Sequence, residues 1–231
     1  MKTITISMVA MVTLLAMAVV VGAQGPSTLR SAGLDLLGGL VGDMVRFERG
    51  MQTIEEILSK DPNNVEAKVL HGNGVMARAG EAFKVGNIEK ANKLWQAGLD
   101  EMAQAVDAAP NNLFVRARRG VVMISASRST PPQMAKPLLE TAVEDFGKLL
   151  EIREKENTLA ERSVHQRGEL LTSLADGWNR LGDTEKARSY FLRITKDLKG
   201  TVYEERANAW LENKPESKKA DYFACTGCHV E

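Results

Sequence analysis

Apolar residues recur at helical intervals through the middle of the chain. The clearest run begins at Trp95 and ends before Pro110, with apolar positions at Leu99, Met102, Ala105 and Val106. Spacings of three and four residues place such side chains on one face of a helix. Similar patterns predict further helices over 47–59, 113–128 and 132–154.

Two closely similar turn sequences separate these helices. Residues 61–64 read Asp-Pro-Asn-Asn, and residues 109–112 read Ala-Pro-Asn-Asn. A proline after a helix end blocks continuation of the helix, and an asparagine can cap the start of the next one. Each turn is therefore predicted to join two helices.

The stretch 168–200 carries small and large residues in the order that a helical hairpin needs. Gly182-Asp183 supplies the turn, and the positions that pack the two helices together are Ala175, Trp178, Ala187 and Phe191. The alanines allow a close approach of the helices, and the aromatic rings fill the space between them. This pattern resembles a tetratricopeptide repeat.

A second, looser match has Gly86-Asn87 at the turn, Ala91 at the close approach and Trp95 at the position of Phe191. Pro62 and Pro110 are about 48 residues apart, whereas tetratricopeptide repeats recur about every 34 residues. The helices are therefore expected to be longer than in a standard repeat.

The resemblance implies an all-α fold over residues 24–213. Antiparallel helical hairpins would stack as a right-handed solenoid, and residues 214–231 would form a flexible linker and tail. Such solenoids present an extended groove that holds peptides or proteins. We therefore expect a protein partner in the groove, although no residue identifies it.

The composition agrees with a helical fold and argues against one class of binding partner. Lys plus Arg number 30, Asp plus Glu also number 30, and only 5% of residues are aromatic. Alanine, leucine and charged helix formers are abundant. Because the charges balance, no long basic face is indicated and we expect no nucleic-acid partner.

The N-terminus resembles a secretory signal peptide. Lys2 precedes an uncharged apolar run over residues 4–21, and Val21-Gly22-Ala23 reads as a small-residue cleavage site. Cleavage after Ala23 predicts an exported, periplasmic protein with no membrane span. No cysteine lies near this site, which argues against a lipid anchor, and the alternative is an uncleaved N-terminal anchor.

The C-terminus carries the attachment motif of a c-type haem. Cys225, Cys228 and His229 read C-x-x-C-H, and these are the two cysteines of the chain. Two thiols in one tight turn can reach both vinyl groups of a porphyrin as thioethers, and the adjacent imidazole can ligate the iron. The motif predicts one covalent haem c, with His229 as an axial ligand.

Three other interpretations of these residues stay open. Cys225 and Cys228 could form a disulfide or a free dithiol, because export exposes them to an oxidising compartment. A zinc site would need a fourth ligand, and His229 lies too close to Cys228 for the usual finger spacing. Residues 221–224 also resemble the segment before the motif in cytochrome c domains, so the motif could be the remnant of a longer cytochrome domain.

The sixth position of the iron has several candidate ligands. They are a group from a partner protein, a solvent molecule, or one of four side chains of this chain: His71, His165, Met76 and Met123. Residues 212–220 are charged, contain Pro215, and are expected to tether the motif to the last helix. A six-coordinate haem would favour electron transfer, and an open position would favour ligand chemistry.

Signals for other chemistry are weak. Gly38, Gly39 and Gly42 lack the Lys-Ser/Thr of a phosphate loop, and neither a Ser-His-Asp arrangement nor a carboxylate pair can be argued from spacing. We therefore expect no enzymatic activity. The sequence predicts a scaffold with one haem that acts in electron transfer or haem-linked assembly. Its expected partners include a redox protein or further copies of the same chain. The alternative is a haem-free adaptor for protein–protein interaction with a terminal disulfide.

Overall fold

The computed structural model describes residues 26–39, 42–219 and 222–223. This part of the chain contains nine α-helices, a short 3₁₀ helix and no strand. The helices are α1 (Pro26–Gly38), α2 (Met44–Lys60), α3 (Val65–Lys84), α4 (Ile88–Ala108), α5 (Leu113–Ala126), α6 (Pro132–Lys155), α7 (Val164–Arg180), α8 (Thr184–Asp197), α9 (Val202–Leu211) and η2 (Pro215–Lys218).

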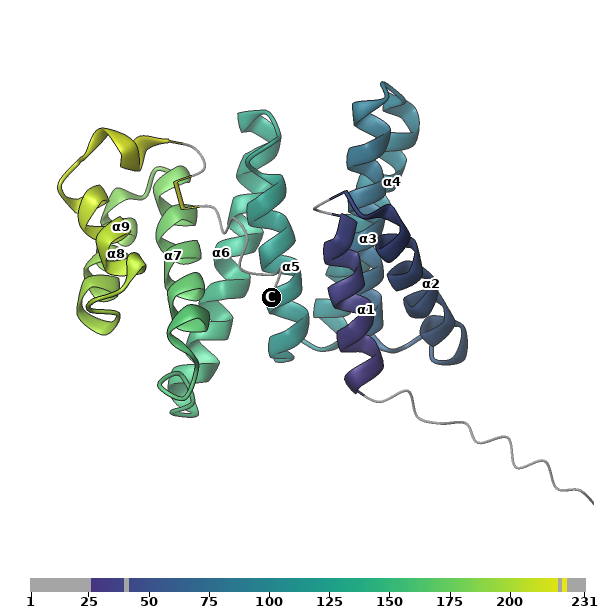
Figure 1. Ribbon diagram of the computed structural model, residues 1–231, viewed down its shortest axis with the longest axis horizontal. Helices are drawn as coiled ribbons and strands as arrows, with labels where there is room; N and C mark the ends of the chain where they lie inside the picture. Colours follow the sequence, from purple (N-terminus) through teal and green to yellow (C-terminus); the bar gives the residue numbers. More distant parts are fainter. Residues whose placement is uncertain (1–25, 40–41, 220–221, 224–231) are drawn as a thin grey trace, which may run out of the picture.

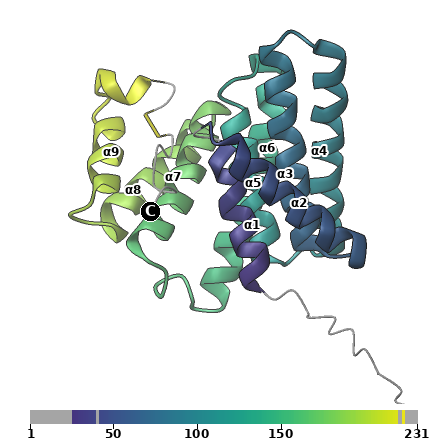
Figure 2. The same ribbon diagram turned by 45° about the vertical axis from the view of Figure 1, so that its right-hand side comes forward.

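Consecutive helices pack as hairpins, which then pack on one another. The pairs are α1 with α2, α3 with α4, α5 with α6, and α7 with α8, while α9 packs on α8. Neighbouring hairpins contact through α2 and α3, α3 and α5, and α6 and α7. Helices α1 to α4 form one end of the stack and α8 and α9 the other (Figures 1 and 2). The predicted all-α, repeat-like architecture is confirmed.

The predicted turns form as expected. Asn64 caps α3 by accepting a hydrogen bond from the Ala67 amide at 3.0 Å, and Asn112 caps α5 in the same way. Gly86 and Gly182 adopt φ angles of 74° and 86°. Because these left-handed values favour glycine, each residue lets the chain reverse before the next helix begins.

Small residues allow α3 and α4 to cross at close range. A Cβ atom on Gly98 would lie 2.8 Å from the Gly72 carbonyl oxygen, so a larger residue would force the two backbones apart. In the hairpin of α7 and α8, the side chains of Ala175, Ala187 and Phe191 are buried, as the repeat pattern predicts. Trp178 is only partly buried and lies beneath the Lys186 ammonium.

The segment after α9 is folded where the structure describes it, rather than extended as a tether. Pro215 begins η2, and Ser217 is buried and donates a hydrogen bond to the Lys214 carbonyl at 2.7 Å. Phe223 is only 8% exposed. This part of the predicted linker is therefore held against the helices.

The predicted signal segment, residues 1–23, and the tail residues 224–231 lie outside the described part. Among the helices that the structure describes, none is long and apolar enough to cross a membrane.

Candidate functional site

An aromatic cluster fixes the chain just before the predicted haem-attachment motif. The rings of Phe191 and Trp210 stack with centroids 4.4 Å apart, and the Phe223 ring lies 5.1 Å from Phe191. The Trp210 indole donates a hydrogen bond to the Asn179 side-chain oxygen at 3.3 Å. These contacts join α7, α8 and α9 to residue 223, two positions before Cys225.

The predicted haem ligands themselves cannot be located. Cys225, Cys228 and His229 lie outside the described residues. Within the described residues, no group of three or more histidine, cysteine or acidic side chains could hold a metal ion. The candidate axial ligands that the structure does describe are His71, His165, Met76 and Met123.

His165 lies at the start of α7 and is oriented by two partners. Its Nδ1 atom is 2.7 Å from the Tyr203 hydroxyl, which itself donates to Glu169 Oε1 at 2.9 Å. Because the single hydroxyl proton points to the carboxylate, His165 Nδ1 must be the donor to Tyr203. These contacts connect the start of α7 to the start of α9.

His71 lies between carboxylates near the other end of the stack. Its Nδ1 atom is 2.6 Å from Glu101 Oε2, and its Nε2 atom is 3.8 Å from Glu55 Oε1. The hydrogen bond to Glu101 raises the pKa of His71 above its ordinary value, while burial opposes this rise. These contacts favour the imidazolium, which has no lone pair for iron.

The charged form of His71 is expected to stabilise the fold in a pH-dependent way. A pKa that is raised on folding gives stabilisation that is complete below the unfolded value of about 6.5 and lost as pH rises through the folded value. We expect the free energy of unfolding of the wild type to fall by on the order of 1 kcal/mol relative to His71→Gln between pH 6 and 9. Urea denaturation at several pH values measures this difference, and parallel curves for the two proteins would contradict it.

The two methionines proposed as ligands are core residues. Met76 on α3 is 5% exposed and Met123 on α5 is 2% exposed. Neither offers its sulfur to an iron atom outside the packed helices.

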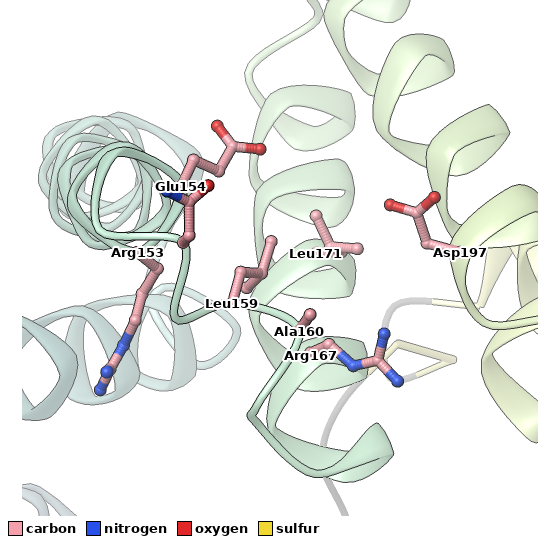
Figure 3. Close-up of a pocket in the computed structure, with 8 residues that line it drawn as sticks. Arg153, Glu154, Leu159, Ala160, Arg167, Leu171 and Asp197 are labelled. Atoms are coloured by element: carbon pink, nitrogen blue, oxygen red, sulfur yellow. The ribbon is translucent and has the colours of Figure 1, made fainter.

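A shallow pocket of about 450 Å³ lies where α6, α7 and α8 meet. Its lining includes the apolar side chains of Leu159, Ala160 and Leu171 between Glu154 and Asp197 (Figure 3). Arg193 pairs with Glu154 at 2.6 Å and with Asp197 at 3.0 Å. Both carboxylates at the pocket are therefore in ion pairs with one arginine of α8.

A buried ionic cluster joins α5 to α6, and the sequence patterns did not predict it. The Asp145 carboxylate is completely buried and accepts hydrogen bonds from Arg116 at 2.7 Å and from Arg119 at 2.7 and 2.9 Å. Arg116 also donates to the Pro110 carbonyl at 2.5 Å. The cluster thus ties the turn before α5 to the middle of α6, a structural role.

No protein-family model, no curated protein and no solved structure matches this chain.

Proposed function

We propose that this chain is an exported helical-repeat scaffold that carries one covalent c-type haem on its C-terminal tail. The observation that carries the proposal is the motif formed by Cys225, Cys228 and His229. The two thiols would hold the porphyrin and the imidazole would ligate the iron. A haem held in this way supplies reversible one-electron transfer, and we propose a role in periplasmic electron transfer or in haem-linked protein assembly.

The position of Phe223 supports this proposal. Phe223 packs on Phe191 of α8 and precedes Cys225 by two residues in the sequence. With the preceding segment held in this way, a haem on the motif would stay beside one scaffold rather than on a long tether. Electron transfer benefits from such a fixed position because the rate depends on where the cofactor meets its partner.

The stack of hairpins supports a protein partner. Repeat scaffolds use their extended surfaces to bind other proteins. The tip between α3 and α4 exposes the apolar side chains of Phe83, Val85 and Ile88, which are 36%, 80% and 53% exposed. A redox protein or a second copy of the chain could use such surfaces, and neither nucleic acid nor a membrane is part of the proposal.

The intact mass of the protein, purified from a host with cytochrome c maturation machinery, tests the proposal. We expect the chain to begin after Ala23 and to carry the added mass of one haem that acid-acetone does not extract. The matched control is Cys225→Ala with Cys228→Ala, which removes both thioether bonds. This variant should be exported equally well and have the mass of the bare chain.

The alternative is a haem-free adaptor whose two cysteines form a disulfide. It predicts a wild-type mass two hydrogens below that of the reduced bare chain, whatever the maturation machinery. That result would contradict the haem proposal. The function would then have to be sought among the proteins that the scaffold binds.

A further inference from the structure

The pocket between α6, α7 and α8 is lined by an arginine that has no carboxylate partner. Among the residues that the structure describes, Arg167 of α7 forms no ion pair, and its buried Nε atom has no hydrogen-bond acceptor. A buried donor without an acceptor is unfavourable, because folding removes the water that it binds in the unfolded chain. A ligand that carries an acceptor group would remove this penalty.

The same pocket has an apolar wall. It consists of the side chains of Leu159, Ala160 and Leu171. Figure 3 shows the Arg153 side chain pointing away from these residues, which leaves Arg167 as the cation beside the wall. A few polar groups among apolar side chains are typical of small-molecule sites, in which the polar groups set the orientation of the ligand. The arrangement fits a molecule with an anionic end and an apolar body.

The acidic residues of the pocket do not neutralise Arg167. Glu154 and Asp197 both pair with Arg193, at 2.6 and 3.0 Å, and this pairing weakens their repulsion of an anion. Together with Arg193, the lining residues include three arginines, at 153, 167 and 193, and two carboxylates, which leaves one positive charge. A ligand with a single negative charge would balance it.

The size of the pocket and the shape of the cation narrow the ligand further. A volume of about 450 Å³ is within the range of sites for small molecules. A planar guanidinium matches a carboxylate, because two parallel N–H groups donate to its two oxygens. A phosphate monoester carries close to two charges at neutral pH and would exceed the single positive charge.

We propose that this pocket binds a small monocarboxylate with an apolar chain. The carboxylate would pair with Arg167, and the chain would pack against Leu159, Ala160 and Leu171. This inference goes beyond the proposed haem function and does not depend on it, so either can fail without the other.

A titration of the full mature chain with hexanoate at pH 7, followed by NMR, tests the proposal. We expect the methyl signals of Ala160 and Leu171 to shift and saturate with a Kd on the order of 1 mM, a reasonable affinity for a ligand of about eight non-hydrogen atoms. Hexanamide has the same chain without the charge, and acetate has the charge without the chain. Both should bind at least about tenfold more weakly than hexanoate.

Two variants test the two halves of the pocket. Arg167→Gln removes the cation, and Ala160→Phe fills the space beside the apolar wall at an exposed position. Each should weaken hexanoate binding at least about tenfold. The matched control is Arg188→Gln, which removes one positive charge from an exposed site nine residues before Asp197, or about 13 Å away along α8. This control should bind hexanoate as the wild type does, and circular dichroism should show wild-type helical content in all three variants.

Several results would overturn the proposal. They are shifts that do not saturate, hexanamide binding as tightly as hexanoate, unchanged binding in Arg167→Gln, and an equal loss of binding in Arg188→Gln. If Arg167→Gln does not fold, the comparison of hexanoate with hexanamide on the wild type and the Ala160→Phe variant still decide the question.

Discussion

Replacing Asp145 with alanine is expected to lower the free energy of unfolding by about 3 to 5 kcal/mol. The carboxylate is fully buried and accepts hydrogen bonds from two guanidinium groups, those of Arg116 and Arg119. Both arginine side chains are themselves at most 10% exposed. Without Asp145 they would remain buried without this acceptor, and that desolvated charge is the source of the expected loss.

Urea denaturation of Asp145→Ala measures this loss, and the neighbouring residue offers a control. Glu144 lies 3.6 Å from Arg116, but its side chain is 67% exposed. Ion pairs at the surface contribute little, so Glu144→Ala should change stability by less than about 1 kcal/mol. A second variant that combines Asp145→Leu with Arg116→Met and Arg119→Leu should recover much of the stability, because it removes the buried charges together. A loss below about 1 kcal/mol in Asp145→Ala would show that water reaches the arginines.

The hairpins could be predicted from the sequence because local chemistry sets their ends. Asn64, Asn112 and Asp183 each precede an apolar periodic stretch, and each caps a helix in the structure. A cap acts within three or four residues of its own position. The prediction therefore did not depend on knowing which helices pack together.

The buried ion pairs depend on contacts between helices, which local patterns do not specify. Asp145 lies among the apolar positions Ala142, Phe146 and Leu150 of α6, and this placement on an apolar face was the signal that could have revealed its burial. Its partners are on α5, 26 and 29 positions earlier. One sequence cannot show which of several arginines would face it.

The same limit applies to the candidate site. His71 and His165 look alike in the sequence, as polar residues on predicted helices. They are distinguished by partners that are distant in the chain: Glu101 for His71, and Tyr203 for His165. The folded linker was also not predicted, because its many charged residues suggested an extended tether. The apolar ring of Phe223 was the signal that could have indicated packing there.

Replacing Phe191 with alanine is expected to lower the free energy of unfolding by about 3 to 5 kcal/mol and to release the segment before the motif. The Phe191 side chain is 1% exposed, and it is the ring that both Trp210 and Phe223 contact. Its loss would leave a cavity between α8 and α9 and would remove the surface on which Phe223 packs. Urea denaturation measures the loss in the free energy of unfolding. Hydrogen exchange measures the release of the segment, at the amides of Ser217, Lys219 and Tyr222. Each of these amides donates a hydrogen bond to a backbone carbonyl.

The neighbouring residue Leu192 separates this effect from a general weakening of α8. Its side chain is 49% exposed, so Leu192→Ala should change stability by no more than about 0.5 kcal/mol and leave the exchange of the three amides unchanged. In Phe191→Ala we expect those amides to exchange at least about tenfold faster, the change produced by a loss of about 1.4 kcal/mol in local opening free energy. If the amides stay protected while global stability falls, the aromatic cluster stabilises the helices without holding the tail, and the position of the motif must depend on other contacts.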